Sequence, residues 1–61
     1  MPWVTIQWFE GRDFETKKNV MKLVTDALVE GCGCKPESVS VVFQDIDKKD
    51  WGNTGIPYAE K

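Results

Sequence analysis

The chain passes through one strand-like segment, one helix-like segment and a second strand-like segment before residue 45, and this order limits the folds open to it. In residues 2–9, apolar side chains from Val4 to Trp8 fall on one face of an extended chain, and Thr5 and Gln7 fall on the other. Alternation of this kind, in β-branched and aromatic residues, predicts a strand over residues 2–9.

A helix is expected after this strand. Asp13 is the expected N-cap, and Glu15 falls in the first turn, where the positive end of the helix dipole favours an anion. Apolar residues recur at helical spacing as far as about Glu30, and Gly31 is the expected stop. The expected apolar face comprises Val20, Met21, Leu23, Val24, Ala27 and Leu28, with Lys18, Lys22 and Asp26 on the opposite side.

Alternation returns in residues 38–44 and predicts a second strand. Strand, helix and strand within a span of about 43 residues favour one right-handed crossover between parallel strands. From Asp45 onward we expect a hairpin or loop with Gly52 and Gly55 at its bends. The expected fold class is therefore α/β (α+β): a single βαβ unit with parallel strands and a C-terminal hairpin or loop, residues 1–61 forming one domain.

A unit this small leaves much of its apolar surface uncovered. A chain of 61 residues hides only about 60% of its extended surface when it folds alone, yet 41% of these residues are hydrophobic and three are tryptophan. Two parallel strands also have bare edges that can pair with another chain. We therefore expect oligomerisation to extend the sheet, in a symmetric dimer or a larger ring.

Charge and hydropathy exclude other classes of partner. The formal net charge is -2 and the isoelectric point is near 4.9, so no basic surface is available for a phosphate backbone, and no nucleic acid partner is expected. No apolar run approaches the roughly 20 residues that span a bilayer, and no leader segment is recognisable. We expect a soluble, cytoplasmic chain without a membrane partner.

The cysteines and the absence of histidine restrict the chemistry. Cys32 and Cys34 could form a strained disulfide or supply two metal ligands, but a closed zinc site needs four, so reduced turn residues are the favoured interpretation. Without histidine, the usual general base and the usual metal ligand are both missing. We expect no metal and no cofactor, and an enzyme built from this chain needs an unusual base.

Pro2 is the candidate for that base. Removal of Met1 would expose a secondary amine, whereas a retained Met1 leaves the Pro2 nitrogen as an amide that cannot accept a proton. An amine stays neutral where apolar surroundings or a neighbouring cation disfavour the ammonium form, and Arg12 is a candidate cation. The candidates for apolar surroundings are Trp3, Trp8, Phe9 and Trp51.

Three other side chains are candidates for binding a substrate. Arg12 is the only arginine, and its planar fork suits a carboxylate, although a surface pair with Glu10 or Asp13 is the alternative. Trp51 is either a pocket wall or an aromatic of the core or interface. The candidate hydrogen-bond donors are Ser40 and Tyr58.

Taken together, these features resemble the 4-oxalocrotonate tautomerase family over most of the chain. The features that carry the resemblance are Pro2, the Glu10-Gly11-Arg12 turn, the helix, the Ser38-Val39 strand opening and the Trp51-Gly52 element. The resemblance implies a homo-oligomer, with dimers assembled into a hexamer. It also implies an isomerase that needs no cofactor and uses its amino-terminal proline as general base in enol–keto isomerisation of an unsaturated 2-oxo acid.

The resemblance assigns roles position by position. It implies that Pro2 is the catalytic base, that Arg12 holds a substrate carboxylate, and that Trp51 lines the pocket from a neighbouring subunit. Ser40 stands where the best-known members have a second arginine, and a hydroxyl cannot replace a bidentate cation. A small-molecule carboxylate substrate is therefore expected, but the usual dicarboxylate does not carry over.

Two alternatives stay open from the sequence. One is a non-enzymatic oligomeric binding module with the same fold, in which Pro2 merely begins a strand. The other is a hydratase-like or dehalogenase-like relative in which Pro2 acts as an acid to help add water to an unsaturated or halogenated acid, with Glu10 or Asp50 activating the water.

Overall fold

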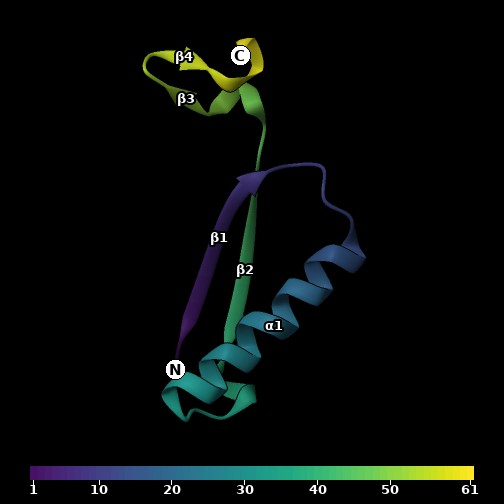
Figure 1. Ribbon diagram of the computed structural model, residues 1–61, viewed down its shortest axis with the longest axis vertical. Coiled ribbons are helices and arrows are strands. Elements are labelled where there is room, and N and C mark those ends of the chain that lie inside the picture. The colour runs from purple at the N-terminus through teal and green to yellow at the C-terminus, as the bar shows by residue number, and fades with distance from the viewer.

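The computed structural model describes residues 1–61 and contains one βαβ unit followed by a small hairpin. Strands β1 (Trp3–Phe9) and β2 (Ser40–Ile46) are parallel, in a register that runs from Trp3 opposite Ser40 to Phe9 opposite Ile46. Helix α1 (Phe14–Cys32) connects them and lies along the pair (Figure 1). The predicted fold class, with its parallel strands and C-terminal hairpin, is confirmed.

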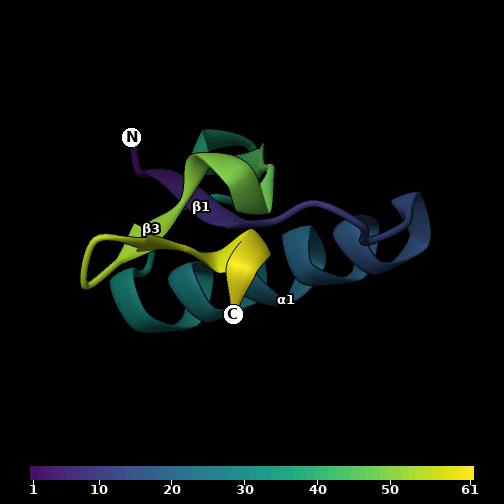
Figure 2. The ribbon, with the colours of Figure 1, turned by 90° about the horizontal axis from the view of Figure 1, so that it is seen from above.

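The alternation in the sequence sets the two faces of the sheet. Val4, Ile6 and Trp8 are half-buried on the face that α1 covers, whereas Thr5 and Gln7 are exposed on the other face. Figure 2 shows the helix on one side of the strands. This face assignment of β1 is as predicted.

Strand β2 begins later than expected. The predicted strand opens at Ser38, but Pro36–Ser38 form a 3-10 turn in which the backbone N–H and the hydroxyl of Ser38 both donate to the Lys35 carbonyl, at 3.0 and 2.8 Å. These bonds hold the segment in a turn, so the pairing with β1 starts at Ser40 and continues to Ile46. The prediction of a strand here was right and its boundaries were wrong.

Helix α1 begins after an Asp13 cap and ends at Gly33. The Asp13 carboxylate accepts the backbone N–H of Thr16 at 2.9 Å, which confirms the predicted N-cap and holds the pKa of Asp13 below its usual value. The predicted stop at Gly31 was wrong, because the helix continues to Cys32 and ends at Gly33. Gly33 has φ 71° and donates to the Val29 carbonyl at 3.0 Å, a left-handed closure that glycine adopts without steric cost.

The C-terminal hairpin lies beyond the far end of β2, away from most of α1 (Figure 1). Strands β3 (Gly52–Asn53) and β4 (Ile56–Pro57) are antiparallel and joined by Thr54 and Gly55, which have φ 56° and 77°. Positive φ at both central positions is typical of a two-residue hairpin turn. Gly55 therefore lies at the bend as predicted, whereas Gly52 lies in a strand instead.

The single chain has no closed core. None of its residues is buried, and the molecule is a thin body of 43 × 24 × 13 Å. Val20, Val24 and Leu28 of α1 are half-buried against the sheet, but Leu23 of the predicted apolar face is 58% exposed. The helix is also too polar to cross a bilayer. Apolar side chains thus remain exposed on both the helix and the sheet.

Candidate active site

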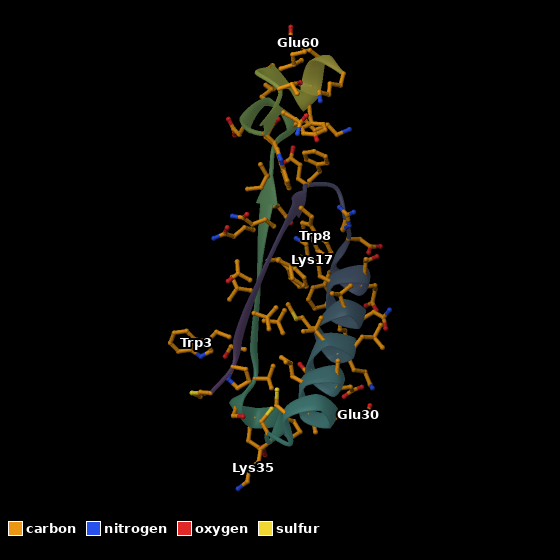
Figure 3. The ribbon with its side chains drawn as sticks, turned by 60° about the vertical axis from the view of Figure 1, so that its left-hand side comes forward. Trp3, Trp8, Lys17, Glu30, Lys35 and Glu60 are labelled. Carbon is orange, nitrogen blue, oxygen red and sulfur yellow. The ribbon has the colours of Figure 1, made fainter.

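Pro2 and Ser40 lie together at one end of the sheet. The Pro2 carbonyl accepts the backbone N–H of Ser40 at 3.0 Å, which places the start of β2 beside the start of β1. Met1 is 85% exposed, so the bond that must be cut to free the Pro2 nitrogen is accessible. The Trp3 side chain, next to Pro2, is 76% exposed and points away from the helix (Figure 3).

Arg12 lies beyond the opposite end of β1, in the loop that leads into α1. Its Nη1 donates to the Phe9 carbonyl at 2.9 Å, and its guanidinium carbon lies 4.4 Å from the centre of the Trp8 ring. The alternative, a surface pair of Arg12 with Glu10 or Asp13, was wrong: neither carboxylate forms an ion pair with it. The guanidinium is instead held against a carbonyl and an indole.

Trp8, which lies under Arg12, is itself anchored. Its Nε1 donates to the Asp45 carboxylate at 2.7 Å, and its ring stacks on Phe43 with the centroids 4.6 Å apart. The Lys17 ammonium of α1 contacts the other oxygen of Asp45 at 2.5 Å. The hydrogen bond from Lys17, followed by that from Trp8, holds the pKa of Asp45 below its usual value. Figure 3 shows Trp8 and Lys17 close together on the helix side of β1.

Trp51 lies at the same end of the molecule as Arg12. It packs against Phe9 and Tyr58, with ring centroids 4.6 and 6.2 Å away, so its intrachain role is that of a cluster aromatic. One side of Trp51 also borders a shallow recess of about 240 Å³. The recess is lined by Gln7, Ile46, Asp50 and Trp51.

The four predicted site residues therefore form two groups at opposite ends of one strand. At about 3.3 Å per residue, the seven residues of β1 keep Pro2 about 20 Å from the Arg12 guanidinium. Within one chain, Arg12 is therefore too far from Pro2 to act on its nitrogen, and an effect of Arg12 on Pro2 requires a neighbouring copy. The same separation removes Trp8, Phe9 and Trp51 as apolar neighbours of Pro2 in the same chain.

The cysteines take no part in either group. Both thiols are free, and the Cys34 thiol donates to the Leu28 carbonyl at 3.5 Å near the end of α1. No group of three or more His, Cys, Asp or Glu side chains is placed to hold a metal ion.

Comparison with known proteins identifies the family. The sequence model described as "Tautomerase enzyme" matches residues 2–60. The 2-hydroxymuconate tautomerase of Comamonas testosteroni is 42% identical over 60 residues, covering 98% of this chain and 95% of that protein. The crystal structure of YwhB, a homologue of 4-oxalocrotonate tautomerase, superposes with a TM-score of 0.94 at 30% identity, covering 98% of each chain.

A heterohexameric 4-oxalocrotonate tautomerase from Chloroflexus aurantiacus superposes with a TM-score of 0.91 at 25% identity, covering 98% of this chain and 97% of that one. The sequence match, the shared βαβ architecture and the length of the aligned region agree with one another. The chain therefore belongs to the 4-oxalocrotonate tautomerase family of the tautomerase superfamily.

Proposed function

We propose that the protein is a tautomerase that interconverts the enol and keto forms of an unsaturated 2-oxo acid, with the Pro2 amine as its general base and without a cofactor. Family membership supports the reaction class. The chain has no histidine, and Pro2 is accessible behind an exposed Met1. After removal of Met1, the Pro2 nitrogen is a secondary amine at the strand end beside Ser40.

The proposed site is built between subunits. The observation that carries this step is the separation of about 20 Å between Pro2 and the Arg12 guanidinium, a span that one small acid cannot bridge. Arg12 and Trp51 lie at the same end of the chain, so one neighbouring copy supplies both. A homo-oligomer is further supported by the absence of a closed core and by the heterohexameric relative.

The proposed reaction moves one proton. The neutral Pro2 nitrogen takes the proton of the enol hydroxyl, the electrons of that O–H bond form the carbonyl, and the conjugated π electrons accept the same proton at carbon. No atom is gained or lost. The Arg12 guanidinium of the neighbouring copy holds the carboxylate through charge-assisted hydrogen bonds, which fixes the reacting carbon against Pro2. Positioned proton transfer of this kind contributes about 100- to 10,000-fold to the rate.

The proposed substrate has one carboxylate. Ser40 lies beside Pro2, and its exposed hydroxyl can donate one hydrogen bond to the developing enolate oxygen but carries no charge. A second carboxylate at this end of the site would lose its hydration without gaining a cation. We therefore expect monocarboxylate enols to be turned over with a higher kcat/KM than dicarboxylate enols.

The test is an absorbance assay of enol loss, run on protein whose intact mass shows that Met1 is absent. Pro2→Ala should lower kcat by at least about 100-fold, because a primary amine differs in basicity and shape from the proline nitrogen. Thr5→Ser, a change on the exposed face of β1 away from both groups, serves as the matched control. An unchanged kcat in Pro2→Ala would remove Pro2 from the mechanism, and no turnover of any 2-oxo acid by the unaltered protein would favour a binding module.

A second candidate function is hydration of an unsaturated acid. Asp50 lines the recess beside Trp51, and its carboxylate is a candidate base for activating a water molecule there. Here Pro2 acts as an acid and Asp50 as the water-activating base. Loss of hydration in Asp50→Asn, with tautomerisation retained, would support this activity; absence of any hydrated product from the unaltered protein excludes it.

A further inference from the structure

The Arg12 guanidinium is held on two sides before any substrate binds. Its Nη1 donates to the Phe9 carbonyl at 2.9 Å, and the Trp8 ring lies beneath it at 4.4 Å. A guanidinium has five N–H donors, and only one of them is used by the Phe9 carbonyl. The remaining donors make no hydrogen bond within the chain, and the Phe9 and Trp8 contacts limit the rotamers of Arg12 before a carboxylate binds.

The Trp8 ring is fixed in turn by its neighbours on β2. The register places Trp8 opposite Asp45, and the indole N–H donates to the Asp45 carboxylate at 2.7 Å. The Phe43 ring lies against the indole at 4.6 Å with an interplanar angle of 2°. An indole held by a hydrogen bond at its edge and a ring on its face cannot turn away from Arg12.

Asp45 is also a potential competitor for Arg12. Asp45 and Arg12 both contact the Trp8 indole, the carboxylate at its N–H and the guanidinium on its ring. Lys17 and then Trp8 lower the pKa of Asp45 most, and the positive charge of Arg12 lowers it least. Lys17 contacts one carboxylate oxygen at 2.5 Å, and the Trp8 indole occupies the other. With its charge countered by Lys17 and one oxygen bound to the indole, Asp45 anchors the indole and attracts Arg12 less strongly.

We propose that Lys17, Asp45 and Trp8 form a positioning chain that presents Arg12 to the substrate carboxylate and prevents Asp45 from pairing with it. These are positioning residues, since none of them touches the substrate. The inference rests on the proposed function only in taking Arg12 as the carboxylate anchor. The held geometry of Arg12 is a property of the protein itself and can be measured without turnover.

The geometry is tested by NMR. Arg12 is the only arginine, so its side-chain Nε–H gives a single resonance, which the Trp8 ring should shift upfield. Trp8→Leu should return this signal to the position of a free arginine, whereas Trp8→Phe keeps a ring and should retain part of the shift. Trp3→Leu, the same change at the other end of β1, is the matched control and should leave the signal unmoved.

A signal that stays in place in Trp8→Leu overturns the inference, whatever the activity. If Trp8→Leu does not fold, Trp8→Phe decides the same question, and an Arg12 signal that does not move in Trp8→Phe overturns the inference. An Arg12 signal that already lies at the position of a free arginine in the unaltered protein overturns it as well.

The competition between Asp45 and the substrate carboxylate for Arg12 is tested by kinetics with a monocarboxylate enol. Lys17→Met leaves Asp45 free to pair with Arg12, so KM should rise by about 2- to 5-fold while kcat changes little. Lys17→Met combined with Asp45→Asn should restore KM, because the amide oxygen still accepts the indole N–H but carries no charge.

A KM unchanged in Lys17→Met, or not restored in the double variant, overturns the guarding role of Lys17. If the unaltered protein has no tautomerase activity, the proposed function fails instead. The kinetic arm is then run as titration of the Arg12 resonance with acetate, in which Lys17→Met must bind more weakly than the unaltered chain.

Discussion

Two impaired variants, Pro2→Ala and Arg12→Gln, should restore activity to each other when their subunits are mixed. The reason is geometric: Pro2 and the Arg12 guanidinium are about 20 Å apart in one chain, so each site takes them from different chains. In a random 1:1 mixture, a site has an intact Pro2 in half of the cases and an intact Arg12 in half. About a quarter of the sites should then be native.

The single variants set the background for this measurement. Loss of the base lowers the rate by about 100- to 10,000-fold. Loss of the charge-assisted hydrogen bonds, about 1.5–3 kcal/mol, lowers it by about 10- to 150-fold. Arg12 is exposed and makes one intrachain hydrogen bond, so its replacement should cost the fold little. A quarter of native activity is well above the mean of two such variants.

The assay mixes the purified variants, exchanges their subunits by denaturation and refolding, and follows enol loss. Each variant carried alone through the same cycle is the control, and a mixture without exchange gives the baseline. Recovery near a quarter supports a site shared between chains. If the exchanged mixture stays at the mean of the two variants while native mass measurements show mixed oligomers, the shared site is refuted.

Three further outcomes follow from the structure. Gly33→Ala should lower the free energy of unfolding by about 1–2 kcal/mol, because Gly33 has φ 71°. Gly31→Ala should raise the free energy of unfolding by about 0.5–1 kcal/mol, because Gly31 lies inside the helix with open space around it. Urea denaturation measures both changes. Lys17 is the main cause of the lowered pKa of Asp45, so ionised Asp45 stabilises the fold above about pH 3.9, and this stability is lost as the pH falls through the lower pKa of the folded state. Asp45→Asn should therefore reduce the fall of the melting temperature at acid pH, measured in a series of thermal melts. The rise of kcat/KM with pH follows deprotonation of the Pro2 amine, and Ser40→Arg should move that rise to lower pH because a second cation disfavours the ammonium; a limb that stays or moves up rejects this reasoning.

The sequence predicts the local elements of this chain well because their signals are local. Alternation from Val4 to Trp8 defines the faces of β1, and the carboxylate of Asp13 caps α1 as its position before the helix indicates. The end of α1 was missed because Gly31 and Gly33 are both plausible stops. Only the backbone angle, positive at Gly33, distinguishes them.

The site was predicted less completely because it depends on distances between elements. The separation of Pro2 from Arg12 follows from the length of β1, and a count of its residues at strand spacing would have shown it. The contact of Trp8 with Asp45 depends on the register of two strands far apart in sequence, which alternation within each strand does not define. The anchoring of Arg12 was therefore visible only in three dimensions.

The central claim is that catalysis depends on a free Pro2 nitrogen, and the most direct measurement compares the chain with and without Met1. The two forms share residues 2–61 and differ in Met1, whose presence makes the Pro2 nitrogen an amide and whose removal makes it an amine. We predict that kcat/KM for a monocarboxylate enol rises in proportion to the fraction of protein from which a methionine aminopeptidase has removed Met1, as measured by intact mass. Equal turnover by the form that retains Met1 would contradict the account.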